Sequence, residues 1–149
     1  MRARDLARPC TPVHLSAGLR EAADLLVRER APALVVVSGD GHPLTVVPTE
    51  RILAAVLPEH VREDPLLAAV AGASLDDEAR ARAASLRLAD VLPKRPLTPA
   101  VVSPDASPLH MASLMQRTSS PIVLVVEYAD DQPHLLGFVD AATLLPYYL

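Results

Sequence analysis

The sequence predicts an α/β fold of two similar halves that share one core, and three observations support this prediction. The chain of 149 residues is long enough for one ordinary domain or two small units, but too short for separate cofactor and substrate domains. Half of the residues are apolar, which rules out disorder of the whole chain. The chain also repeats itself, and internal repeats decide an architecture before any local pattern does.

The repeat shows as a set of apolar and proline positions that recur at one constant offset of 89 residues. They are Val13, Ala23, Leu25, Leu26, Pro32 and Val35–Val37, opposite Val102, Ala112, Leu114, Met115, Pro121 and Leu124–Val126. Further along, Leu44–Val47 lies opposite Leu136–Val139 at an offset of 92, so the second copy has a turn three residues longer. Upstream, Arg4–Leu6 matches Ala89–Val91 at an offset of 85. Such length differences belong in loops.

The first copy begins with a short strand near Val13 and an amphipathic helix. The apolar residues between Leu19 and Leu26 recur at helical spacing, with charged residues between them. We expect this helix to end before Pro32, because proline disfavours helical geometry in the residue that precedes it.

A hairpin and a second helix complete the first copy. Ala33–Val37 is a short apolar run, and the turn residues 38–43 separate it from Leu44–Val47, which predicts two paired strands. A helix is expected from about Thr49 to Leu57. The repeat predicts the same order, strand, helix, strand, strand, helix, in the second copy.

Residues 60–88 have no counterpart in the repeat and form a helical connector. Asp64-Pro65 predicts one helix start, and Ser74–Asp77 predicts a capping box ahead of another. Arg80, Arg82 and Arg87 either form a basic patch or belong to a solvated helix face of mixed charge, because acidic residues directly precede them. The mixed-charge face is the favoured interpretation.

Composition excludes several functions. The chain has 14 basic and 18 acidic residues, and only 3% of it is aromatic, which argues against nucleic-acid binding by charge or by stacking. A single cysteine, Cys10, forms no internal disulfide and indicates a reducing compartment. No apolar stretch is long enough to span a bilayer, so we expect a cytoplasmic protein without membrane insertion. The histidines lack metal-ligand spacing and Cys10 has no base near it in sequence, so we predict that the chain is not an enzyme and holds no metal.

The duplicated order resembles the tandem cystathionine-β-synthase (CBS) domain pair, or Bateman module. The matching segments are Arg4–Leu6 with Ala89–Leu92, Leu19–Leu26 with Leu109–Met115, Ala31–Val37 with Ser120–Val126, and Leu136–Val139 before the last helix. The resemblance implies CBS motif 1 at residues 1–58, a connector at 59–88 and CBS motif 2 at 89–149. It also implies that the two sheets pack sheet to sheet, back to back, and that two clefts lie between the motifs.

The resemblance further implies a regulatory role. Members of the family commonly bind AMP, ADP, ATP or S-adenosylmethionine, form dimers, and control an enzyme or transporter without catalysing a reaction. Because the chain holds the pair alone, we expect its effector to be a separate protein.

Ligand-binding members end each copy with the pattern Gly-apolar-apolar-Thr/Ser-x-x-Asp, from which this chain departs. The corresponding segments are Thr45–Arg51 and Gly137–Thr143, and only Gly137 keeps its signature residue. By position, the candidate ligand-binding residues are Val13, Ala33, Val47, Pro48, Thr49, Arg51, Val102, Ile122, Val139, Asp140 and Thr143.

The replaced residues change what each cleft can bind. Asp140 places a carboxylate where a phosphate would approach the helix start, although aspartate is also a preferred N-cap. Pro48 has no N–H, which leaves Thr49 as the expected cap. Arg51 is either a phosphate or carboxylate contact, or a surface residue paired with Glu50 or Asp24.

Two hypotheses follow. The first is a regulatory module that binds an adenosyl nucleotide or another small anion, most plausibly in the motif 1 cleft. The alternative is a pair with degenerate ligand sites that acts as a dimeric scaffold. The apolar segments Ile52–Leu57 and Thr143–Leu149 favour burial against a second protomer, and burial within the pair is the other interpretation.

Overall fold

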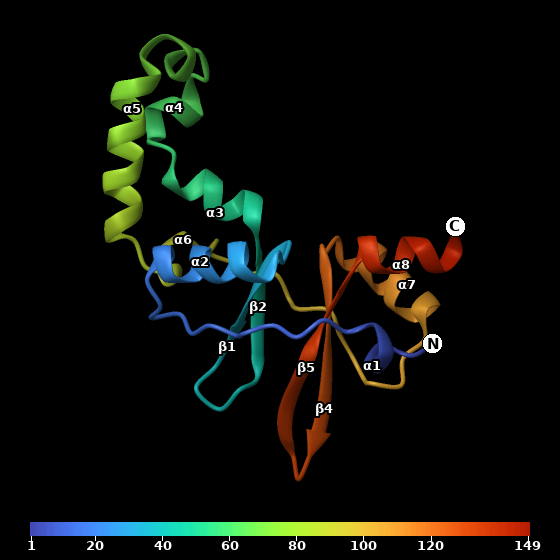
Figure 1. Cartoon of the computed structure of the whole chain (residues 1–149). Helices are drawn as coiled ribbons and strands as arrows, with labels where there is room; N and C mark the ends of the chain where they lie inside the picture. The colour runs from blue at the N-terminus through green and yellow to red at the C-terminus, as the bar shows by residue number, and fades with distance from the viewer.

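The structure is a computed structural model that describes residues 1–149, and it contains two small sheets side by side (Figure 1). In the first, β1 and β2 are antiparallel; in the second, the order is β3-β4-β5. The strands are β1 (Ala33–Val37), β2 (Pro43–Pro48), β3 (Val101–Val102), β4 (Ile122–Ala129) and β5 (Gln132–Asp140). The helices are α1 (Ala3–Leu6), α2 (Leu19–Glu29), α3 (Thr49–Val56), α4 (Glu59–Glu63), α5 (Leu66–Ser85), α6 (Leu88–Val91), α7 (Pro108–Thr118) and α8 (Ala141–Tyr148). The α/β fold class predicted from the sequence is confirmed.

The repeat is visible in the strand register. Val13 forms a parallel bridge with Val36, and Val102 pairs in the same way with Val125. The register shift in the first hairpin lies between Val36 and Val37, and that of the second lies at the equivalent place, between Val125 and Val126. The two copies therefore share their β-bulge as well as their order of elements.

The two sheets pack together through one face of β4. Ile122, Leu124 and Val126 are buried in the same apolar cluster as β1 and β2, whereas Val123 and Val125 belong to a cluster with residues of α7 and α8. Successive side chains of a strand point to opposite faces, so one face of β4 contacts the first half and the other face contacts the helices of its own half.

The segment that leads into each copy packs against the other copy. The backbone of Arg8 pairs with that of Phe138 in β5, with N–H to oxygen distances of 2.9 and 3.0 Å, so the N-terminal segment docks on the second half. In return, Leu88 and Val91 of α6 are buried in the core of the first half. The motif boundaries at residues 58 and 88 stay a prediction.

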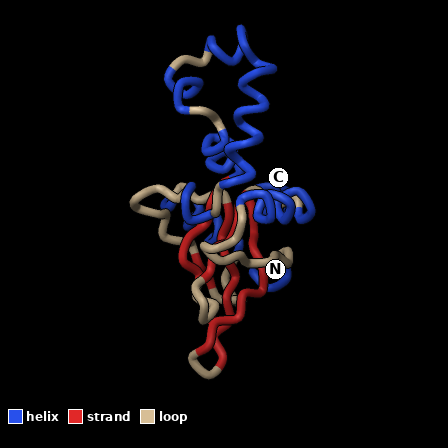
Figure 2. Tube along the Cα trace, turned by 90° about the vertical axis from the view of Figure 1, so that its left-hand side faces the viewer, coloured by secondary structure: helices blue, strands red, loops and turns tan.

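The connector rises from the module as a helical arm, α4 and α5, on the side away from the tips of the two hairpins (Figures 1 and 2). The predicted start at Asp64-Pro65 is present, because a carboxylate oxygen of Asp64 accepts the N–H of Leu66 at 3.2 Å. The predicted cap at Ser74 is wrong, since Ser74 lies inside α5, which kinks earlier, at Ala71. The N–H groups after Ser74 find carbonyl acceptors in the preceding turn and need no cap. None of the helices combines the length and apolar character that crossing a membrane requires.

Candidate functional site

The candidate site of motif 2 lies where β5 ends and α8 begins. Asp140 is the N-cap of α8, and one of its carboxylate oxygens accepts the N–H of Thr143 at 2.9 Å and the hydroxyl of Thr143 at 2.8 Å. The capping role considered from the sequence is thus present. The other carboxylate oxygen accepts a hydrogen bond of 2.7 Å from Nη2 of Arg8.

Arg8 reaches Asp140 from the N-terminal segment, and its guanidinium lies 4.7 Å from the centre of the Phe138 ring. A cation over an aromatic face is attracted by the ring quadrupole. The Nε atom of Arg8 is buried without a hydrogen-bond partner, so the side chain is held by the bond from Nη2 to Asp140 and by the ring.

Gly137 allows the N-terminal segment to cross β5. A Cβ atom at this position would collide with the carbonyl oxygen of Arg8, and the φ angle of +155° lies in a region that side chains disfavour. The one signature residue that motif 2 keeps is therefore explained by a backbone crossing within this chain.

The electrostatics of this cleft are balanced internally. Burial raises the pKa of the Asp140 carboxyl, but the hydrogen bonds from Thr143 and the charge and hydrogen bond of Arg8 outweigh it and hold the pKa below its ordinary value. Asp140 is ionised at neutral pH, and its charge is neutralised by Arg8. A ligand that approached this helix start would therefore meet a carboxylate whose charge is already paired with Arg8.

The equivalent site of motif 1 is built from different side chains. Pro48 stands where motif 2 has Asp140, Thr45 where it has Gly137, and Leu97 where it has Arg8. The hydroxyl of Thr45 donates a hydrogen bond of 2.7 Å to the carbonyl oxygen of Leu97. In motif 1, a neutral hydrogen bond therefore joins the lead-in segment at Leu97 to the hairpin at Thr45.

The start of α3 differs from the sequence-based expectation. Pro48 occupies the N-cap position without a side-chain cap, so the prediction that Thr49 caps the helix is wrong. Thr49 is already helical, which carries its hydroxyl away from the free N–H groups of the first turn. That hydroxyl lies 3.4 Å from the carbonyl oxygen of Pro32, which also accepts the N–H of Thr49 at 3.1 Å.

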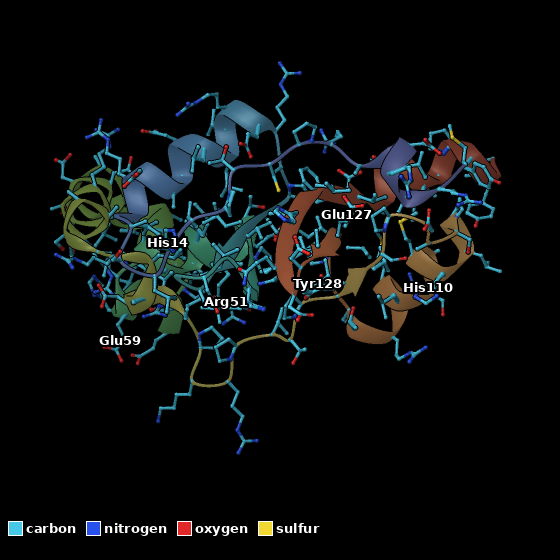
Figure 3. The ribbon with its side chains drawn as sticks, turned by 90° about the horizontal axis from the view of Figure 1, so that it is seen from below. His14, Arg51, Glu59, His110, Glu127 and Tyr128 are labelled. Atoms are coloured by element: carbon cyan, nitrogen blue, oxygen red, sulfur yellow. The ribbon has the colours of Figure 1, made fainter.

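Arg51 is exposed and forms no ion pair, so the expected pairing with Glu50 or Asp24 is absent. It lines a hollow of about 20 Å³ together with Thr45–Pro48 and with Leu92, Pro93 and Leu97. It also lines a hollow of about 230 Å³ on its other side, towards the connector. Figure 3 shows Arg51 within the first half of the molecule, far from His110 in the second.

A third hollow of about 400 Å³ opens beside Pro48, between the two halves. Glu50, Gln116 and Ser119 contribute its polar lining, and Met115 and Ala141 add carbon atoms. Pro48 and Arg51 together therefore border all three hollows at this end of the molecule.

The other predicted residues divide by burial. The strand positions are inside the core and are not open to solvent; they are Val13, Ala33, Val47, Val102, Ile122 and Val139. Pro48, Thr49 and Thr143 are half-buried at the helix starts. Sequence reasoning missed Arg8 and Leu97, because the lead-in segments match at an offset of 85, which does not align these two residues.

No group of three potential metal ligands comes together in the structure. Burial, with the nearby Glu29 carboxylate, raises the pKa of the Cys10 thiol to about 11. The thiol is protonated at neutral pH and is a poor nucleophile.

The comparisons with known proteins rest on structure. Neither a protein-family model nor a curated protein matches the chain. A CBS domain-containing protein of unknown function from Kribbella flavida matches with a TM-score of 0.80 and 30% identity, over 100% of both chains. CBSX2 of Arabidopsis thaliana, solved in complex with AMP, matches with a TM-score of 0.61 and 19% identity, over 98% of this chain and 94% of that one.

The CBS domain pair of protein MJ0100, solved with 5′-methylthioadenosine and S-adenosyl-L-methionine, matches with a TM-score of 0.65 and 17% identity, over 99% of this chain and 95% of that one. At these lower identities the two ligand complexes share the fold with this chain. The relative from Kribbella flavida adds 30% identity across the full length of both chains, and the duplicated register and bulge are present here in both halves. This chain therefore belongs to the CBS domain family, as a pair of CBS motifs.

Proposed function

We propose that this CBS pair is a regulatory module that binds an adenosyl nucleotide or another small anion in the motif 1 cleft and passes that state to a partner protein. The observation that carries the proposal is the unpaired guanidinium of Arg51, which borders two hollows, whereas the carboxylate of Asp140 at the equivalent helix start of motif 2 is paired with Arg8. Complexes of related folds with AMP and with S-adenosyl-L-methionine support the choice of ligand class.

The small hollow at Pro48 suggests how binding is transmitted. About 20 Å³ holds little more than a water molecule, so a nucleotide enters only if the segment Leu92–Leu97 moves away from β2. That segment leads directly into motif 2. A ligand that favours the displaced arrangement thus shifts the population of conformers in both motifs.

Thermal unfolding with AMP, ADP, ATP and S-adenosylmethionine tests the proposal. A ligand present at 100 times its dissociation constant stabilises the folded state by about 2.7 kcal/mol, so at least one compound is expected to raise the melting temperature. Absence of any shift at millimolar concentration contradicts the proposal.

Arg51→Ala is expected to abolish the ligand-induced shift. Arg117→Ala is the matched control, because Arg117 is an exposed arginine of α7 that forms no ion pair. If both variants keep the wild-type response, the ligand binds elsewhere.

Titration calorimetry measures the number of sites. Because Asp140 is already paired with Arg8 at 2.7 Å, we expect one ligand per chain. Two equivalent ligands per chain would show that the motif 2 cleft opens as readily as the motif 1 cleft.

A dimeric scaffold is the second candidate function, and the apolar surface of α3 and α8 favours it. Leu53 is 67% exposed and Leu145 55% exposed, and Tyr147 and Tyr148 lie beside the latter. Light scattering is expected to give twice the 15.9 kDa of the chain, and Leu145→Glu is expected to return the monomer. Leu66→Glu, at an exposed apolar position of α5, serves as the control. A wild-type mass of a single chain excludes the dimer.

A further inference from the structure

The connector brings two arginines to the cationic residue of motif 1. Arg62 of α4 and Arg82 of α5 line the hollow of about 230 Å³ together with Arg51 of α3. In Figure 1 the connector folds back so that the lower part of α5 stands next to α2 and α3. We call this hollow, lined by three arginines from three helices, the arginine pocket.

Positive charge exceeds negative charge in the lining of the arginine pocket, with three arginines to one carboxylate. None of the three guanidinium groups forms an ion pair, and the one acidic residue of the lining is Asp90. The carboxylate of Asp90 accepts the backbone N–H of Arg87 at 2.9 Å, as part of the cap of α6. Like charges gathered around one hollow repel one another, and a bound anion offsets that repulsion.

Arg82 is held in place for such a role. Its Nε donates a hydrogen bond of 3.1 Å to the carbonyl oxygen of Ala55 near the end of α3. A guanidinium has five N–H donors in a rigid fork, so the four on the outer nitrogens stay available. Arg51 and Arg62 bring further unpaired donors. The planar fork of N–H donors in each guanidinium matches the geometry of phosphate oxygens.

The geometry points to a phosphate-binding site in the arginine pocket, formed jointly by motif 1 and the connector. Its ligand is a dianionic phosphate group, either of free phosphate or of a phosphate monoester or polyphosphate. The inference rests on the proposed function only through Arg51, because Arg62 and Arg82 lie outside the cleft between the motifs. The connector thereby gains a function, which is to supply two of the three cationic contacts.

Isothermal titration of the full chain with inorganic phosphate, and separately with pyrophosphate, tests the site at constant ionic strength held with chloride. We expect saturable binding, weakened at least tenfold by Arg62→Ala and by Arg82→Gln. Arg80→Ala is the matched control, because Arg80 is exposed on the same helix as Arg82 but does not line the pocket, and it is expected to change the dissociation constant less than twofold. Circular dichroism melting confirms that each variant is folded.

The outcomes separate this site from the nucleotide proposal. Phosphate binding that needs Arg62, without binding of any adenosyl compound, supports the arginine pocket and contradicts the nucleotide proposal. Nucleotide binding that is lost in Arg51→Ala but unchanged in Arg62→Ala and Arg82→Gln, in a chain that binds neither phosphate nor pyrophosphate, supports the nucleotide proposal and overturns the arginine pocket. Absence of phosphate and pyrophosphate binding at 10 mM, or equal weakening by Arg80→Ala, also overturns the pocket.

Discussion

The start of α8 and the start of α3 occupy equivalent places in the two motifs, yet their charges differ. In motif 2 the carboxylate of Asp140 is neutralised by Arg8 from the N-terminal segment at 2.7 Å. In motif 1 the equivalent lead-in residue is Leu97, the equivalent of Asp140 is Pro48, and the cation of Arg51 has no partner. A duplicated backbone thus supports one helix start whose charge is paired within the chain and one with an unpaired positive charge.

This difference arises where the lead-in segments contact the two hairpins. A lead-in segment contacts each hairpin, but the contacts differ: the backbone of Arg8 pairs with that of Phe138, whereas Leu97 accepts a side-chain hydrogen bond from β2. An ion pair with a cation–π contact ties one crossing, whereas a neutral hydrogen bond from Thr45 ties the other. We therefore expect the N-terminal crossing to resist opening and the crossing at Leu97 to be the movable one.

The largest expected effect comes from Gly137→Ala, which tests whether the motif 2 crossing depends on close backbone contact. The added Cβ meets the carbonyl oxygen of Arg8, so the N-terminal segment has to leave β5. We expect the free energy of unfolding to fall by about 3 kcal/mol, measured by chemical denaturation. Gly39→Ala, where a Cβ meets nothing within 4 Å, is the control. Equal losses in the two variants contradict the close-contact explanation.

Arg8→Ala breaks the ion pair that distinguishes motif 2. The partly buried carboxylate of Asp140 loses a charged partner and Phe138 loses its cation, which together stabilise the fold by about 1 to 2 kcal/mol. The loosened segment also exposes Cys10, so its reaction with a thiol reagent is expected to accelerate. Arg4→Ala removes an exposed contact with Asp105 and is expected to change neither measurement. An unchanged thiol reaction rate in Arg8→Ala means that the pair does not hold the segment.

Thr45→Val examines the corresponding tie in motif 1. The carbonyl oxygen of Leu97 loses the donor at 2.7 Å, and we expect a loss of about 1 kcal/mol in unfolding free energy, less than in Arg8→Ala. Thr11→Val, at an exposed threonine, is the control. If Thr45→Val destabilises the chain more than Arg8→Ala does, the assignment of the movable crossing is reversed.

The smallest effect is the pH dependence of the Asp140 charge, tested with Asp140→Asn, which keeps an N-cap residue. Because folding lowers the pKa of Asp140, the unfolded state binds the proton more readily. The stabilisation is therefore complete above the unfolded value of about 3.9 and is lost as pH falls through the lower folded value. We expect the wild type to exceed Asp140→Asn by less than about 1 kcal/mol at pH 7. Denaturation curves between pH 6 and pH 2 are expected to converge, and a constant difference contradicts the charge assignment.

Much of the fold could be predicted from the sequence, because its signals are local. Apolar periodicity and turn residues predicted the strands and helices of the first copy. The constant offset, as between Val13 and Val102, predicted the same elements in the second copy. The same logic failed at Ser74, where a pattern typical of a cap lies inside a continuous helix. It failed at Thr49 for a related reason, since a cap depends on which N–H groups are free.

The candidate site could be predicted only in part. The sequence drew attention to Arg51 and Asp140 through their positions in a family pattern, but the contacts of each residue were not readable. Arg51 has neither of the acidic partners expected for it. Arg62 and Arg82 line the same hollow as Arg51 only because the connector folds back against α3.

The sequence by itself determined the duplication, the class of fold and the loss of the usual ligand signature, because these depend on residue types and their spacing along the chain. Only the tertiary structure decided which helix start carries a paired charge and which an unpaired one. Arg8 and Asp140 are 132 positions apart, and they meet because the N-terminal segment crosses to the opposite motif. Charges interact through space, so the ion pair of Arg8 with Asp140 and the unpaired state of Arg51 are decided only when the two halves pack together.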